Sequence, residues 1–131
     1  MKRDVYSGWL RLDGEEHRST VTIMAANNYA VTLRVLQRFE EVKSLLRKMM
    51  HVAPRVLGEN DETTLTMRWN YAEALVSADN ATVDDLHEAV TTLEETARIA
   101  RRVFGGSHPF TSKIEGELRG ARAALRARET G

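Results

Sequence analysis

One short pattern occurs nearly three times in this chain of 131 residues, and it limits the possible folds more than any other feature. The segment Gly14–Thr22 returns as Gly58–Thr66, and a looser copy returns as Gly105–Thr111. The copies begin 44 and then 47 residues apart. A period in this range is typical of stacked supersecondary units, each of which is too small to bury its own apolar face. The repeat therefore favours a binding scaffold over an enzyme.

The segments that lie between the copies of this pattern also correspond between the two units. Asn28-Tyr29-Ala30 in the first unit matches Asn70-Tyr71-Ala72 in the second. Phe39 and Leu86 each lie 19 residues before the glycine that closes their unit. The second helix of each unit therefore aligns without a gap.

Apolar residues recur at helical spacing in both units. In the second unit Leu65, Trp69, Ala72 and Val76 step by 4, 3 and 4 residues, which is one stripe of a helix. No stretch shows the alternation of a half-buried strand, so the predicted fold class is all-α. The expected helices cover residues 19–36, 38–57, 63–78, 83–104 and 110–128.

Hydroxyl side chains and prolines mark the expected helix ends. The candidate N-caps are threonines, whose hydroxyls can accept from free backbone N–H groups: Thr20, Thr22, Thr64 and Thr66. Pro54 falls near the end of the helix expected over 38–57, where it removes a backbone hydrogen bond. Because the apolar stripe continues through Val56, a bend at Pro54 is predicted there rather than a break.

Composition excludes several classes of protein. Hydrophobic content of 42% and charged content of 29% are ordinary for one globular domain of this length. The absence of cysteine excludes disulfides and thiolate zinc sites, and it fits a reducing compartment. No apolar run is long enough to cross a membrane, and the N-terminus lacks a hydrophobic signal core. An intracellular, cytoplasmic location is therefore predicted.

The motifs resemble a known repeat class. The pattern Gly-x-x-His/Asp-x-x-Thr-x-Thr, then Asn-Tyr-Ala, then Arg-Val-Leu-Gly is similar to tetratricopeptide repeats of the kinesin light chain type. The resemblance covers about residues 14–128. It implies a right-handed solenoid of antiparallel helix pairs, with about two and a half repeats and five helices. The domain boundaries expected on this basis are a tail or partial cap over 1–13, units over 14–57 and 58–104, and a terminal capping helix over 105–131.

The resemblance also implies a binding site. In such repeats the first helix of each unit lines a concave groove that holds an extended peptide, and an asparagine bonds the peptide backbone. Asn28 and Asn70 occupy that position here, and a carboxamide offers both donors and an acceptor. The other residues expected to bind peptide are Asn27, Arg34, Trp69 and Glu73. A core position for Trp69, and bonds from the asparagines to a neighbouring helix or to water, remain alternatives.

The predicted function is therefore a non-catalytic adaptor or scaffold that binds a protein or peptide and needs no cofactor. No catalytic constellation is found, and no two histidines share a helix face at metal-binding spacing: His17, His51, His87 and His108. One alternative is nucleic-acid binding through the last helix, where Arg119, Arg122 and Arg126 share a side. Another is a purely structural self-association module.

The two ends of the predicted stack differ in how their apolar surface is expected to be covered. The last helix has one apolar stripe and a polar outer face, as a terminal helix needs. The first unit has no such cover unless an N-terminal turn folds back over it, built from Val5, Trp9, Leu10 and Leu12. Uncovered apolar surface recruits partners, so weak homodimerisation through the N-terminal end is predicted.

Overall fold

The computed structural model describes residues 20–130, which form an all-α helical repeat of five helices without a strand in that range. The first helix is described over residues 20–35. The others are α2 (Phe39–Leu57), α3 (Glu62–Ser77), α4 (Val83–Phe104) and α5 (Pro109–Thr130). The bounds of these four agree with the predicted ranges to within two residues. The all-α helix-pair repeat is confirmed, while the cap proposed for residues 1–13 lies outside the described residues.

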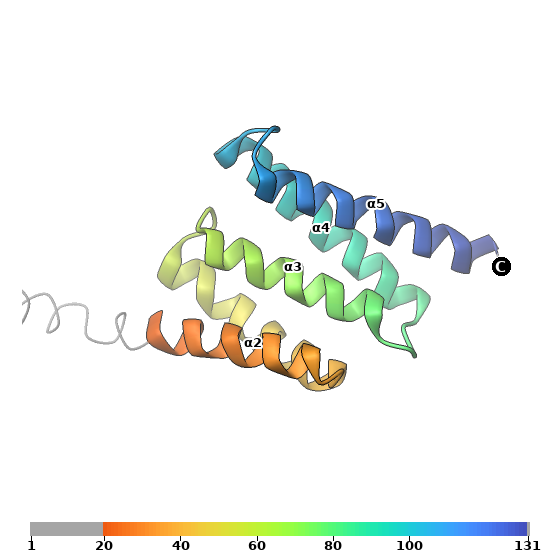
Figure 1. The fold of residues 1–131 in the computed structure, drawn as a ribbon, viewed down its shortest axis with the longest axis horizontal. Helices are drawn as coiled ribbons and strands as arrows, with labels where there is room; N and C mark the ends of the chain where they lie inside the picture. The colour runs from red at the N-terminus through yellow and green to blue at the C-terminus, as the bar shows by residue number, and fades with distance from the viewer. Residues whose placement is uncertain (1–19, 131) are drawn as a thin grey trace, which may run out of the picture.

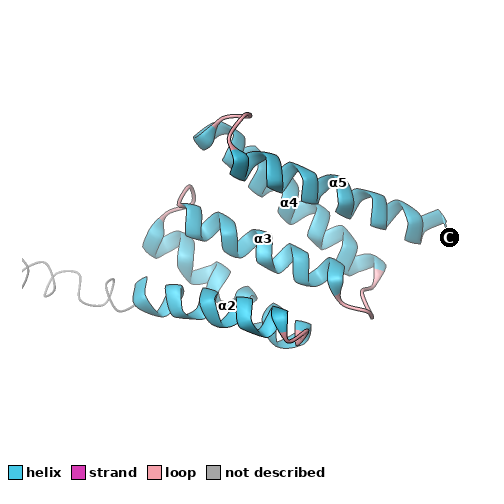
Figure 2. Cartoon of the chain, viewed as in Figure 1, coloured by secondary structure: helices cyan, strands magenta, loops and turns pink. Residues whose placement is uncertain are grey.

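The helices form a stack of two layers (Figure 1). Helix 20–35, α3 and α5 lie in front, and α2 and α4 lie behind them. The central helix α3 packs against both α2 and α4, whereas α5 packs mainly against α4 and touches α3 only lightly. Short loops join the helices at their ends (Figure 2). The first helix of each unit therefore contributes to one common face.

The linkers between units repeat the same backbone geometry. Gly58 and Gly105 end α2 and α4 with φ values of 102° and 93°, a region that favours glycine. The N–H of Gly58 donates to the carbonyl of Pro54 at 3.0 Å, and that of Gly105 donates to the carbonyl of Arg101 at 3.0 Å. The recurring glycine of the sequence pattern is thus a helix stop in both linkers.

The next helix starts in an equivalent way after each linker. Asp61 accepts a hydrogen bond from the backbone N–H of Thr63 at 2.8 Å. His108, which lies 47 residues later, accepts through Nδ1 from the N–H of Phe110 at 3.1 Å. The Asp-or-His position of the repeat pattern therefore supplies an acceptor to the first turn of the following helix.

The predicted threonine caps of α3 are wrong. Asp61 is the N-cap residue, and Thr64 and Thr66 both lie inside the helix. Thr64 is 1% exposed, and its Oγ1 has no hydrogen-bond partner. Thr22 likewise lies within helix 20–35. The apolar pattern located the helix, but the carboxylate three residues upstream is the group that caps it.

Pro54 does not end α2. The helix continues through Pro54 to Leu57, as the unbroken apolar stripe predicted. The carbonyl of Pro54 still accepts from Gly58, so the proline removes a donor from the ladder and leaves the helix stop intact.

Tyr71 on α3 is the largest fully buried side chain, at 1% exposure. Its hydroxyl accepts from Arg47 of α2 at 2.6 Å and donates to Glu88 of α4 at 2.5 Å. One tyrosine therefore joins three helices through a satisfied polar chain. Burial and the bond to Glu88 raise the pKa of Tyr71 to about 12, even though Arg47 acts in the opposite direction.

Candidate functional site

The two asparagines of the Asn-Tyr-Ala motif lie in different environments. Asn70 is 8% exposed, and its Nδ2 donates to Oδ1 of Asn27 on the neighbouring helix at 3.3 Å. Asn28 is exposed. The helix-to-helix bond left open from the sequence is thus the arrangement of Asn70, whereas the carboxamide of Asn28 faces solvent.

Arg34 and Glu73 form an ion pair between helix 20–35 and α3. Their side chains are 31% and 28% exposed, so the pair lies at the surface yet is partly screened from water. A shallow, open hollow of about 270 Å³ adjoins it. The residues that line this hollow are Arg34, Val35, Gln37, Phe39, Glu73 and Ser77. Two of the predicted site residues are therefore brought together beside a recess.

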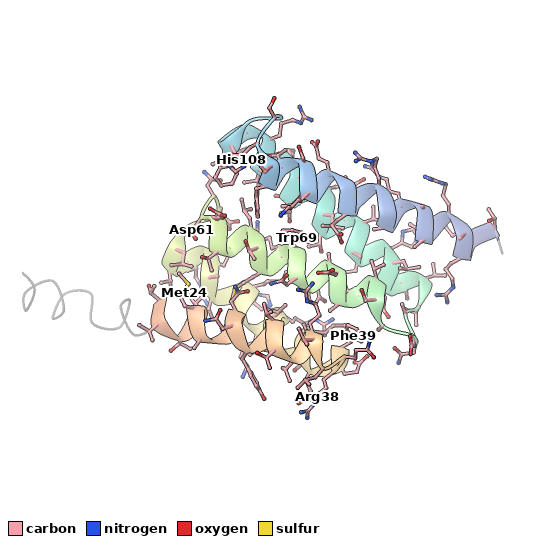
Figure 3. All side chains as sticks on the ribbon, viewed as in Figure 1. Met24, Arg38, Phe39, Asp61, Trp69 and His108 are labelled. Carbon is pink, nitrogen blue, oxygen red and sulfur yellow. The ribbon has the colours of Figure 1, made fainter. Side chains whose placement is uncertain are left out.

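Trp69 is partly buried and lies on the side of α3 that faces α5 (Figure 3). Its ring meets Phe110 edge to face, with centroids 5.9 Å apart and an interplanar angle of 76°. Its buried Nε1 makes no hydrogen bond of standard geometry, and the Glu117 carboxyl is the acceptor that it approaches. Trp69 therefore packs partly against the core and partly between α3 and α5.

Glu117 on α5 is a further polar residue of the common face, and the sequence pattern did not predict it as a binding residue. Burial raises the pKa of Glu117, and the nearby carboxylate of Glu73 raises it further. The Trp69 indole and Arg34 lower it by smaller amounts. Glu117 lies 47 residues after Asn70, and 47 residues is also the distance between the second and third copies of the repeated pattern. This spacing could have indicated Glu117 as the equivalent of Asn70.

Five polar residues form a strip across the common face, which is made by the first helix of each unit and by α5. Asn27 and Arg34 come from helix 20–35, Asn70 and Glu73 come from α3, and Glu117 comes from α5. Their interactions connect helix 20–35 to α3, and α3 to α5. Such a strip can bond the backbone and the charged side chains of an extended chain laid across the helices.

Many arginines near the C-terminal end are engaged within the chain. Arg98 pairs with Glu95, Arg101 with Glu115 and Arg122 with Glu94. Arg128 donates to the backbone carbonyl of Ala81. The basic face expected from the sequence is thus interleaved with carboxylates that reduce its positive potential.

Residues 20–130 contain no group of three or more His, Asp or Glu side chains placed to hold a metal ion. Within the same range no helix has the length and the apolar character needed to cross a membrane.

Comparison with known proteins adds one finding. Residues 77–110 match the family model of the tetratricopeptide repeat. The match supports a tetratricopeptide repeat over this segment. It spans the last residue of α3, all of α4 and the linker into α5, which is the segment in which Gly105 and His108 form the repeated stop and start. Such repeats generally mediate protein–protein interaction, and no catalytic family is indicated. No curated protein and no solved structure matches the chain.

Proposed function

We propose that the chain is a non-catalytic adaptor that binds an extended peptide across helix 20–35, α3 and α5. One observation carries the proposal: polar side chains of helix 20–35 and α3 pair across the common face, and one of these pairs, Arg34 with Glu73, lines a hollow. The repeat match over residues 77–110 supports it, because repeats of this class generally bind proteins or peptides. The closer relation to the kinesin light chain type rests on the sequence motifs and is part of the same proposal.

The strip favours a ligand with a basic side chain. Burial raises the pKa of Glu117, and the nearby Glu73 carboxylate raises it further. A lysine or arginine of the ligand would offset both effects through charge-assisted hydrogen bonds. Asn28 is exposed, so its carboxamide can bond the ligand backbone.

A display selection with random decapeptides against the full chain tests the proposal. We expect the enriched peptides to be rich in lysine and arginine. Glu117→Gln and Glu73→Gln should each weaken their binding about tenfold, because each substitution removes one charge-assisted bond. Fluorescence anisotropy of a labelled selected peptide gives the dissociation constants.

Arg126→Ala on α5 is the matched control, because Arg126 is exposed and no ion pair involves it among the described residues. It should leave peptide affinity unchanged. The proposal is wrong if the selection enriches no peptide, or if the selected peptides bind the Glu117→Gln and Glu73→Gln chains as tightly as the wild type.

A further inference from the structure

The segment of residues 20–36 holds most of the exposed large hydrophobic side chains in the part of the chain that the structure describes. Seven large hydrophobic side chains are exposed among residues 20–130, and all but Val103 lie between residues 21 and 36. These six are Val21, Met24, Tyr29, Val31, Val35 and Leu36, with exposed fractions from 36% to 73%. Apolar exposure gathered in one place marks an interaction surface.

The same face carries no charge. Arg34 is the one charged residue between positions 20 and 35, and it is paired with Glu73. The exposed side of α5 differs, because it presents charged side chains to solvent, among them Arg119, Arg126 and Glu129. An uncharged, apolar partner surface therefore fits this face of helix 20–35 over most of the length of the helix.

Five residues of this face form one narrow stripe. Val21, Met24, Asn28, Val31 and Val35 step by 3, 4, 3 and 4 residues, which is the spacing of a seam between two helices. Reversal about Asn28 exchanges Val21 with Val35 and brings Met24 to within one residue of Val31. The stripe thus matches an antiparallel copy of itself.

We propose that a second copy of this chain covers this face, in an antiparallel pair of helices 20–35 with a two-fold axis at Asn28. An isologous contact of this kind needs a surface that is complementary to itself, and a neutral stripe that reverses onto itself meets that condition. This inference goes beyond the proposed peptide binding.

Asn28 is suited to the position on the axis. A carboxamide is both donor and acceptor, so two copies that face each other can each donate to the other. A single asparagine in an apolar seam also fixes the register, because a shifted pairing would bury an amide without a partner. Asn28 also belongs to the proposed ligand set, so pairing of two chains competes with the ligand for this residue.

The pairing is expected to be weak. One pair of helices of this length buries less than the roughly 1,200 Å² found at the lower limit of specific stable interfaces. Complexes of that size have dissociation constants of about a micromolar or weaker.

Sedimentation equilibrium of the full chain without any ligand tests the pairing. The mass should rise from 14.8 kDa towards twice that value as the concentration is raised from about 1 μM to about 1 mM. Asn28→Asp should weaken the dimer at least about tenfold at neutral pH, because it places two carboxylates on the axis. Asn80→Asp, at an exposed asparagine in the turn after α3, is the matched control and should leave it unchanged.

Cysteine cross-linking tests the register, since the chain has no cysteine of its own. Asn28→Cys should form a disulfide with its own copy under mild oxidation. Val21→Cys alone should not, because the two copies of residue 21 would lie about 21 Å apart along the antiparallel pair. A mixture of Val21→Cys and Val35→Cys chains should cross-link.

A chain that stays monomeric at every concentration overturns the proposal. So does a dimer that Asn28→Asp leaves intact and that Asn28→Cys does not cross-link, because another surface would then be responsible. The wild-type chain could also be a monomer while the Trp9→Asp chain forms a dimer. That result would show that the N-terminal segment of the same chain, and not a second copy, covers this face in the wild type. None of these measurements involves a ligand, so their failure is distinct from a failure of peptide binding.

Discussion

Tyr29 and Tyr71 occupy the same place in the Asn-Tyr-Ala motif of successive units, yet Tyr29 is 56% exposed and Tyr71 is 1% exposed. The alanines that follow them, Ala30 and Ala72, are both buried. The face that packs on the second helix of the same unit is therefore alike in the two units. Among residues 20–130, the face directed towards a preceding unit is covered only in the second unit.

The difference shows that place in the stack, and not the motif itself, determines burial. The helix of Tyr71, α3, packs between α2 of the preceding unit and α4 of its own unit, and the Tyr71 hydroxyl bonds to both. Within residues 20–130 no helix precedes helix 20–35, so Tyr29 has no equivalent of α2. The same three letters thus code for a core position in one unit and for an open surface in the other.

The largest expected effect comes from truncating each tyrosine in turn. Tyr71→Ala should lower the free energy of unfolding by about 3–5 kcal/mol, because it leaves a cavity among three helices. Tyr29→Ala should change it by less than about 0.5 kcal/mol, as exposed sites usually do. Urea unfolding followed by circular dichroism measures both, and equal losses would remove the distinction between the two units.

A smaller effect separates the hydroxyl of Tyr71 from its ring. Tyr71→Phe keeps the packing and should cost about 1–2 kcal/mol, because it removes the bonds to Arg47 and Glu88, which water can partly replace.

The same substitution alters the pH dependence of stability. The folded state holds the Tyr71 proton up to a pKa of about 12, above the ordinary value of 10, so the unfolded state releases the proton first. This stabilisation is complete below pH 10 and is lost as the pH rises to 12. The wild type should therefore lose stability over this range more steeply than Tyr71→Phe, and parallel curves from urea unfolding at several pH values would contradict the assignment.

The smallest effect concerns the asparagines of the motif. Asn70→Ala should cost about 0.5–1.5 kcal/mol, because Asn70 is buried and bonded to Asn27. Asn28→Ala should leave the free energy of unfolding nearly unchanged, since Asn28 is exposed. Chemical unfolding of the two variants compares these losses directly. A larger loss of stability for Asn28→Ala than for Asn70→Ala would contradict the burial assigned to the two asparagines.

Features that depend on local sequence were predictable. Apolar stripes and recurring glycines gave the bounds of α4 without error, because the stripe lies within the helix and the stop, Gly105, directly follows it. The cap at Asp61 was missed because a threonine near a helix start was preferred to the carboxylate that precedes it. The repeat spacing that aligns Asp61 with His108 would have corrected the choice.

Features that depend on the stack were not predictable from a local motif. Asn28 and Asn70 are both followed by Tyr-Ala in the sequence, yet only Asn70 is buried, on the side of α3 that bonds to Asn27 of helix 20–35. The pairing of Arg34 with Glu73 likewise joins residues 39 positions apart. Glu117 is an intermediate case, since its place is encoded in the 47-residue spacing although its residue type differs from asparagine.

The central claim, that place in the stack determines the burial of the two tyrosines, has a direct test. Fluorotyrosine is incorporated into the Asn28→Asp chain, which keeps helix 20–35 free of a second copy, and the signals are assigned with Tyr→Phe variants. A soluble gadolinium chelate should then broaden the fluorine signal of Tyr29 strongly and leave that of Tyr71 sharp. Equal broadening of both signals, or stronger broadening at Tyr71, would contradict the account.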